Sequence, residues 1–155
     1  MTAAAPTTVT STVTTTAMQD DIKSIPTIAV ITLERGGFGQ ASSTLLTLQR
    51  DGSASYRVTG NARMGQANQA HAASLPRADF EALARLVVAQ RFFALEDQYA
   101  DPQIADGAWL SIGVQRQGQL KSVFSRDGAG PAALKAVEAA IEGLRQRLQF
   151  VAVPP

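Results

Sequence analysis

Acidic side chains crowd into one short stretch of the sequence, LEDQYADPQIADG. The stretch contains Glu96, Asp97, Asp101 and Asp106. Several oxygen ligands on a short loop suit Ca²⁺ or Mg²⁺, and a pair of carboxylates can also serve as general acid and base. The alternating Asp-x-Asp-x-Asp-Gly spacing of a calcium loop is absent. Two interpretations stay open: a solvated acidic loop, or a cation site formed by Asp97, Asp101 and Asp106.

Histidine and cysteine offer little further chemistry. His71 is the only histidine and the chain contains no cysteine, which excludes a thiolate nucleophile and a Cys/His zinc site. No Gly-x-Ser-x-Gly nucleophile elbow is present for His71 to activate. We expect His71 to be solvent-exposed in a polar, glycine-containing loop, and we expect no cofactor. The sequence favours a non-enzymatic protein over an enzyme.

Arginines gather around the first expected hairpin, where Arg35, Arg50, Arg57 and Arg63 could form a basic edge. Nucleic-acid modules usually add stacking aromatics on the same face, but only Tyr56 is near, and alternation points it inward. The formal net charge of +1 also gives no field that favours nucleic acid or an anionic membrane. We interpret the arginines as guards of exposed strands against edge pairing, and no nucleic acid is expected as partner.

Aromatic residues supply the best candidates for a binding surface. In the strand expected at 108–116, Trp109 is out of phase with the apolar residues, so alternation directs it to the other face of the sheet. There it is either covered by another segment or exposed as an aromatic anchor, a residue type that often dominates interface energy. Phe38 lies in a glycine-rich turn. The candidate binding residues are therefore Trp109, Phe38 and Arg57.

Three glycines surround Phe38 in the stretch LERGGFGQASS, at 33–43. Glycines behind a strand can form a dinucleotide fingerprint, but that motif requires a strand that leads into a helix whose N-terminus holds the pyrophosphate. Here the glycines lead into a second expected strand, 44–50. The stretch is therefore predicted to be a wide turn and not a phosphate cradle.

The elements that position these residues are strands, two hairpins and two helices. A strand apolar on both faces, 27–34, precedes the turn, and hairpins are expected around Asp51-Gly52 and Gln117-Gly118. Helical spacing of apolar residues predicts one helix that begins at Ser74 and another that begins at Pro131. The order implies an α+β fold: an antiparallel sheet of about five strands with two helices packed on it.

The ends of the chain differ in composition from its middle. Residues 1–24 are rich in threonine and alanine and have too little apolar bulk to offset ordering entropy. They are predicted to be a disordered tail or tether, followed by a single α+β domain at 25–150 and an unstructured C-terminus at 151–155. No apolar run approaches the roughly 20 residues of a transmembrane helix, and the first residues lack the pattern of a signal peptide.

The stretch LERGGFGQASSTLLTLQRDGSASYRVTG resembles the opening of a bacterial domain family of unknown function that is often found in envelope lipoproteins. Members combine an apolar strand with Cys-Phe-Gly-x-Cys-Pro and a Gly-Asp-Gly turn. Phe38-Gly39 match the Phe-Gly, Asp51-Gly52 match the turn, and the resemblance extends over roughly 28–148. Gly37 and Ala41 stand at the two cysteine positions, so any pairing or redox role that the resemblance implies is absent here.

Two hypotheses on function follow. The resemblance implies a shared fold and an exported setting, and it assigns no catalytic residue. The first hypothesis is a non-enzymatic interaction or ligand-binding module of the bacterial cell envelope, whose partner is a protein or a small ligand. The alternative is a small metal-dependent hydrolase that uses the acidic loop, 96–106. For location, the periplasm or envelope, with a signal already removed, is preferred over the cytoplasm.

Overall fold

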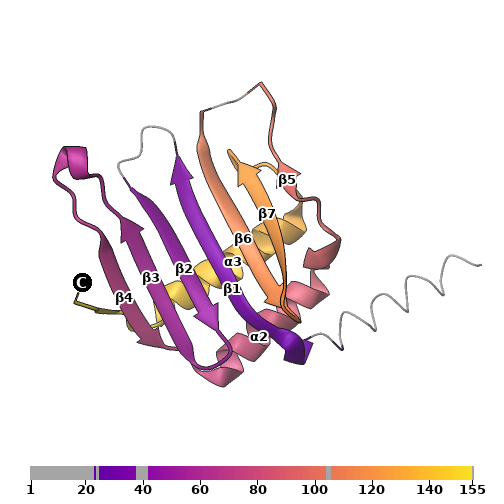
Figure 1. Ribbon diagram of the computed structural model, residues 1–155. Coiled ribbons are helices and arrows are strands. Elements are labelled where there is room, and N and C mark those ends of the chain that lie inside the picture. The colour runs from indigo at the N-terminus through magenta and orange to yellow at the C-terminus, as the bar shows by residue number, and fades with distance from the viewer. Residues whose placement is uncertain (1–22, 24, 38–41, 104–105, 155) are drawn as a thin grey trace, which may run out of the picture.

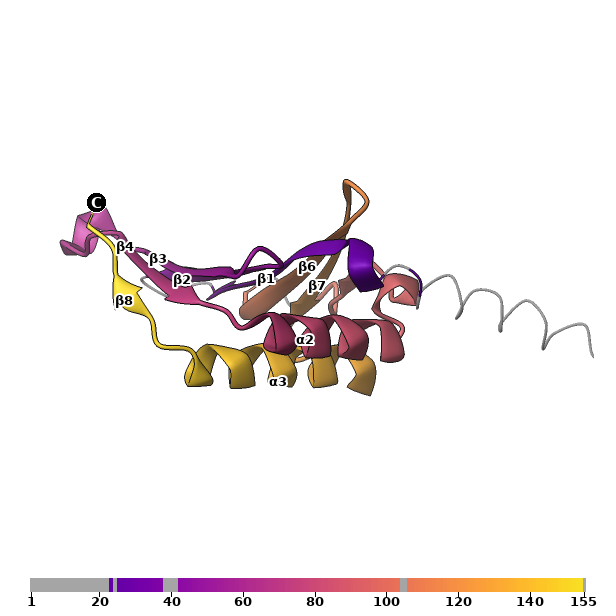
Figure 2. The ribbon, with the colours of Figure 1, turned by 90° about the horizontal axis from the view of Figure 1, so that it is seen from below.

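The computed structural model describes residues 23, 25–37, 42–103 and 106–154. Within them, eight strands form one sheet, and two helices pack on one of its faces (Figures 1 and 2). The fold is therefore α+β, as the sequence predicts. Of the expected tail, only Lys23 belongs to the described residues, and Phe38 lies outside them.

The strands are defined by their order in the sheet, which is β5-β7-β6-β1-β2-β3-β4-β8. The parallel pair is β5 with β7, and the other neighbours are antiparallel. Their bounds are β1 Ile28–Gly37, β2 Ser43–Gln49, β3 Ser53–Thr59, β4 Gln69–Ser74, β5 Gln98–Tyr99, β6 Ala108–Arg116, β7 Gln119–Arg126 and β8 Val151–Ala152.

The expectation of about five antiparallel strands is wrong, because β4, β5 and β8 are additional and β5 makes the sheet mixed. β4 was not predicted because its side chains are small or polar and show no alternation of large apolar and polar residues. The two-residue β5 is held by backbone contact, in which the Phe124 N–H donates to the Asp97 carbonyl oxygen at 2.9 Å. The expected unstructured C-terminus, 151–155, contains β8, which pairs Ala152 with His71.

Both expected hairpins are present. In the second, Gln117 and Gly118 have φ of 51° and 75°, the double left-handed conformation of a two-residue type I′ turn. In the first, Gly52 has a positive φ of 98° while Asp51 does not. The Ser53 hydroxyl and N–H both donate to Asp51 Oδ1, at 2.7 and 2.9 Å, and these bonds lower the pKa of the Asp51 carboxyl.

The two helices are α2, Arg77–Ala89, and α3, Ala132–Arg147. The first begins three residues later than predicted, because Ser74 ends β4 and Pro76 occupies the cap position. Short 3₁₀ turns lie at η1 Ile25–Thr27, η2 Ala62–Met64 and η3 Phe92–Ala94. No helix in the described part of the chain has the length and apolar content to cross a membrane.

The hydrophobic core lies between the sheet and the helices. Register places alternate strand residues together on the helix side, because paired residues share a face of the sheet. Burying each such side chain contributes roughly 1.5–3 kcal/mol. The fully buried large side chains include Ile31, Leu46, Leu48, Ile112 and Val114 from the sheet, Phe80 and Val87 from α2, and Leu134 and Ile141 from α3.

The other face of the sheet is not covered by either helix, as Figure 2 shows, and we call it the open face. Across its middle runs a row of small residues that are paired strand to strand. Leu120 of β7 borders the row, with its Cδ1 3.3 Å from the position of a Cβ on Gly113. This row consists of Ala72, Ser55, Thr47, Thr32, Gly113 and Ser122.

Candidate functional site

Trp109 lies on the open face, on the side of β6 opposite the core, as strand alternation predicts. Its side chain is half-buried. The indole stacks on Phe124 of β7 with ring centroids 5.9 Å apart and planes inclined by 24°, and the guanidinium carbon of Arg126 lies 5.3 Å from the Phe124 ring centre. Trp109 is therefore part of an aromatic cluster and not an isolated exposed ring.

Gly36 allows the indole to lie over β1. The two residues are paired across strands, and a Cβ added to Gly36 would lie 2.7 Å from Trp109 Cζ2 and 3.1 Å from Nε1. Such distances are too short for non-bonded atoms, so any side chain at this position must displace the ring. The glycine is needed here for close approach of a side chain, and its φ is not in the positive range.

The indole borders a hollow of about 430 Å³ at the end of the open face, which we call the tryptophan hollow. Arg63 of η2 stands on its rim, positioned by Asn61, whose Oδ1 accepts from the Arg63 N–H at 3.0 Å. Glycine backbone and hydroxyl groups complete the lining. Its residues are Gly36, Gly37, Ser42, Ser43, Thr59, Gly60, Asn61, Ala62, Arg63 and Trp109.

A second hollow of about 560 Å³ lies against β3, β4 and β8, and we call it the arginine hollow. Arg57 of β3 is exposed beside it, and register places Arg57 on the open face between Leu45 and Ala70. Thr59 lines both hollows, so they adjoin. The lining consists of Arg57, Val58, Thr59, Asn68, Gln69, Ala70, His71, Ala152 and Val153.

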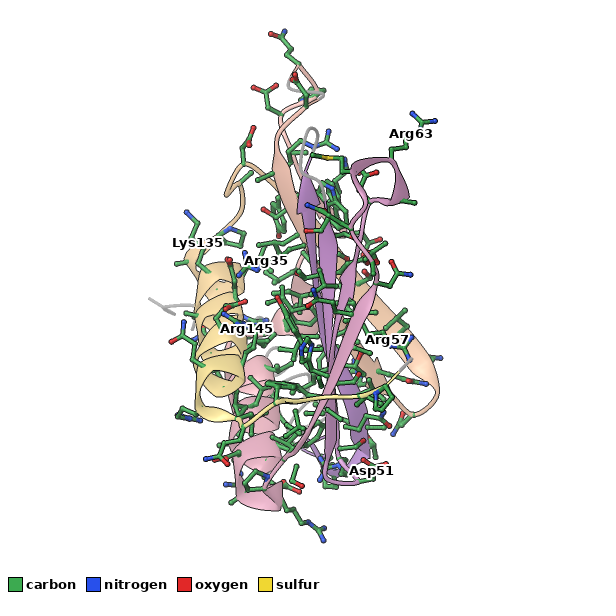
Figure 3. The ribbon with its side chains drawn as sticks, turned by 90° about the vertical axis from the view of Figure 1, so that its left-hand side faces the viewer. Arg35, Asp51, Arg57, Arg63, Lys135 and Arg145 are labelled. Carbon is green, nitrogen blue, oxygen red and sulfur yellow. The ribbon has the colours of Figure 1, made fainter. Side chains whose placement is uncertain are left out.

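The four arginines expected to share one basic edge are divided between the two faces. Figure 3 shows Arg35 between the sheet and α3, whereas Arg57 and Arg63 lie on the side away from α3. Arg35 pairs with Glu138 at 2.8 Å and with Glu142 at 3.3 Å. The expected basic edge is therefore not formed. Of the four arginines, Arg57 and Arg63 lie near the hollows of the open face, where Arg126 of β7 also lies, paired across strands with Trp109.

Arg50 has a structural role that the sequence did not reveal. Its Nε donates to the Ile28 carbonyl oxygen at 2.7 Å and its Nη2 to the Ile25 carbonyl oxygen at 2.6 Å, while Nη1 pairs with Glu81 of α2. Its guanidinium carbon also lies 5.0 Å from the Phe80 ring centre. Arg50 thus joins η1, β1 and α2.

The described carboxylates of the acidic loop make separate contacts. Asp97 pairs with Lys121 at 2.7 Å, and the same ammonium donates to the Leu95 carbonyl oxygen at 2.6 Å. Asp101 Oδ1 accepts from the Gln103 N–H at 2.9 Å, and Asp106 is exposed. Among the described residues, no group of three Asp, Glu or His side chains is placed to hold a metal ion.

His71 is half-buried, not exposed as expected. Register puts it on the helix side, opposite Tyr56 on β3, and the two rings lie 6.4 Å apart. Its Nδ1 is buried and has no hydrogen-bond partner. The expectation failed because β4 was not predicted, so the residue was assigned to a loop.

Phe124 and Gly36 are the members of the site that sequence reasoning missed, and a signal for Phe124 was present. In a hairpin closed at Gln117-Gly118, residue 124 falls on the same face as residue 109. The signal for Gly36 was weaker, since a glycine near a turn is expected for conformational reasons alone. Phe38, the other aromatic candidate, lies outside the described residues.

Comparison with known proteins gives a family but no activity. The family described as "Domain of unknown function (DUF6438)" matches residues 29–145, which is most of the chain. This confirms the expected likeness to a family of domains of unknown function. No curated protein matches the chain.

Proposed function

The chain belongs to the DUF6438 family of domains of unknown function, and we propose that it is a non-enzymatic binding module whose open sheet face holds a partner. The observation that carries the proposal is the position of Trp109. Its indole borders the tryptophan hollow on a face that neither helix covers. Tryptophan on such a surface is the residue type that contributes most to binding energy.

The surroundings of the indole support this role. Phe124 stacks against it and Gly36 lets it lie over β1, so the ring is held before any partner arrives. Binding then requires little additional ordering of the side chain. Arg63, Ser42 and Ser43 supply polar groups around it, which is the usual composition of a binding site: an apolar surface with a few polar groups.

The middle of the open face offers hydroxyl groups with which a partner can form hydrogen bonds. The Ser111 and Ser122 hydroxyls lie 3.1 Å apart, and a Cβ at Gly113 would lie 2.6 Å from Thr32 Oγ1. Gly113 itself is buried beneath the Thr32 and Leu120 side chains, so a partner would meet hydroxyl groups there and not the backbone. The row of small residues extends the surface from the hollows toward the other end of the strands.

Catalysis receives no comparable support. Asp97 is engaged by Lys121, and His71 faces Tyr56 on the helix side. No nucleophile and base are paired among the contacts of the described residues near the hollows. The metal-dependent hydrolase is therefore not adopted.

A pair of aromatic variants tests the proposal. Trp109→Leu removes the ring from the open face, while the control Phe93→Leu removes a ring that contacts Arg116 and Phe92 elsewhere. Each should lose about 1 kcal/mol of stability, the usual worth of an aromatic pair. Protein immobilised in native-host extract should retain a partner as wild type and as Phe93→Leu, and lose it as Trp109→Leu. Equal retention by both variants would contradict the proposal.

The cell-envelope setting is a further part of the proposal, and the resemblance to envelope lipoproteins supports it. It is tested by fractionating the native host and detecting the full-length protein with an antibody. We expect the protein with the envelope fraction. Recovery with the cytosolic markers would contradict this setting and leave the binding role untouched.

A further inference from the structure

We infer that the arginine hollow binds a carboxylate, and that the ligand of the open face is an elongated molecule with this carboxylate at one end. The inference deepens the proposed function and rests on it for the part played by Trp109. The carboxylate site itself is argued from Arg57 and its neighbours alone.

Arg57 is an exposed cation that has no acidic partner among the described residues. It lies on β3, and its cross-strand neighbours are the uncharged Leu45 and Ala70. The nearest acid in the same cross-strand row is Glu34, which is two strands away with Leu45 between them. By contrast, Arg35 and Arg50 on the helix side are both neutralised by glutamates.

The remaining groups of the arginine hollow are suited to an anion. None of the residues that line it is an aspartate or a glutamate. Asn68 Oδ1 accepts from the Gly60 N–H at 2.9 Å, which turns its carbonyl away and leaves the amide nitrogen as the available donor. Together with the Thr59 hydroxyl, the hollow offers donors beside one positive charge.

The charge balance favours a carboxylate over a phosphate. A guanidinium binds a carboxylate through two parallel N–H···O bonds, which matches both the shape and the single negative charge of that group. A phosphate monoester carries nearly two negative charges at neutral pH, and no second cation lines the hollow among its described residues. The single positive charge of Arg57 is therefore balanced by the single negative charge of a carboxylate.

The distance between Arg57 and Trp109 sets the length of the ligand. Arg57 lies on β3 and Trp109 on β6, separated by β2 and β1. Register puts Ser111 in the row of Arg57, and Trp109 lies two residues further along β6. Three inter-strand steps of about 4.8 Å and this offset of about 6.8 Å give roughly 16 Å, which an extended peptide spans with about five residues. The ligand then has a carboxylate at Arg57 and a flat apolar group on Trp109, and the segment between them crosses β2 and β1.

Acetate tests the carboxylate site directly. Titration of the full chain, followed by NMR, should shift the signals of residues 57–59 and 68–70 saturably, and the isosteric neutral acetamide should not. Arg57→Gln should weaken acetate about tenfold or more, because a charged hydrogen bond is worth roughly 1.5–3 kcal/mol. Arg85→Gln, an exposed arginine of α2, is the matched control and should bind acetate as wild type does.

Ligands of graded length test the connection to Trp109. In the series N-phenylacetyl-oligoglycine, affinity should peak at about four or five glycines, the length that spans roughly 16 Å. Trp109→Leu should abolish the peak and leave acetate binding intact. If acetate binds at Arg57 but affinity does not depend on the number of glycines, the elongated ligand is overturned. The same result is the one expected if the proposed role of Trp109 fails while the carboxylate site is correct.

Three results would overturn the carboxylate assignment itself. These are an equal response to acetate and acetamide, an unchanged acetate affinity in Arg57→Gln, and tighter binding of inorganic phosphate than of acetate. A free organic acid and a peptide are distinguished by the same series, because only the peptide-length probes reach both Arg57 and Trp109.

Discussion

At the scale of single residues, the site depends on how closely Phe124 and Gly36 approach the Trp109 ring, and not only on the presence of a tryptophan. Trp109 was predicted on the opposite face from the core, and the structure places it there. What alternation could not show is that Phe124 stacks on one part of the ring and Gly36 lies beneath another. These contacts turn a half-exposed tryptophan into a fixed platform.

Gly36→Ala tests that platform. The added methyl group would lie 2.7 Å from the indole, so the ring must move, and overpacking of this kind lowers the free energy of unfolding by about 1–3 kcal/mol. Since Trp109 is the only tryptophan, its fluorescence spectrum reports the displacement directly. Both changes are expected, measured by chemical denaturation and by emission.

Gly143→Ala is the matched control. This glycine lies within α3, and a Cβ there meets no atom within 4 Å. Alanine should raise the free energy of unfolding by up to about 1 kcal/mol through helix propensity, with unchanged tryptophan emission. A Gly36→Ala protein as stable as wild type, with the same emission, would show that the indole does not lie over β1.

At the scale of elements, the sequence predicted what local periodicity encodes. The two hairpins and the two helices follow from turn residues and from apolar spacing, and all four are present. β4, β5 and β8 were missed because their pairing depends on neighbours distant in the chain. The residues of β4 are small or polar, and strand formation there requires the free edge of β3, which no local pattern announces.

Dependence on residues distant in the chain also explains why the prediction of a basic edge of arginines failed. Arg35 meets glutamates more than 100 positions away along the chain, so its role was invisible to a reading by sequence proximity. The candidate site was partly predictable for this reason. The face on which Trp109 lies depends on local alternation, whereas the tryptophan hollow requires segments from β1, β2, β3 and η2 to meet.

Arg50 offers a test of how the elements are joined. Arg50→Met removes the pairing with Glu81 and leaves the Ile25 and Ile28 carbonyl oxygens without their donor. Loss of partners for half-buried polar groups should lower the free energy of unfolding by about 1–3 kcal/mol. Arg63→Met, at an exposed position, should change it by less than about 0.5 kcal/mol. Equal values for the two variants in urea denaturation would contradict the joining role.

At the scale of the whole molecule, the hydrophobic core and the proposed binding surface lie on opposite faces of the sheet. The helices bury one face of the sheet, and the other remains open with its hollows at one end. An antiparallel sheet tolerates such one-sided burial, since its strands can alternate between apolar and polar side chains. The open face is therefore available for binding without disturbing the core.

Divalent cations should leave the stability of the whole protein unchanged. A cation that binds only the native state raises the melting temperature by mass action, but the Asp97 carboxylate is already paired with Lys121. We expect no shift in a thermal melt with Ca²⁺, Mg²⁺ or Mn²⁺ at millimolar concentration. A rise that is lost in Asp101→Asn or Asp106→Asn would restore the cation site to the acidic loop.

The most direct test of the central claim compares the two faces of the molecule in the native host. A photo-crosslinking amino acid is placed either at Thr59, which is exposed on the open face and lines both hollows, or at Ala139, which is exposed on α3. We predict a discrete adduct from position 59 that is lost when Trp109→Leu is added, and none from position 139. No adduct from position 59, or the same adduct from both positions, would contradict the account.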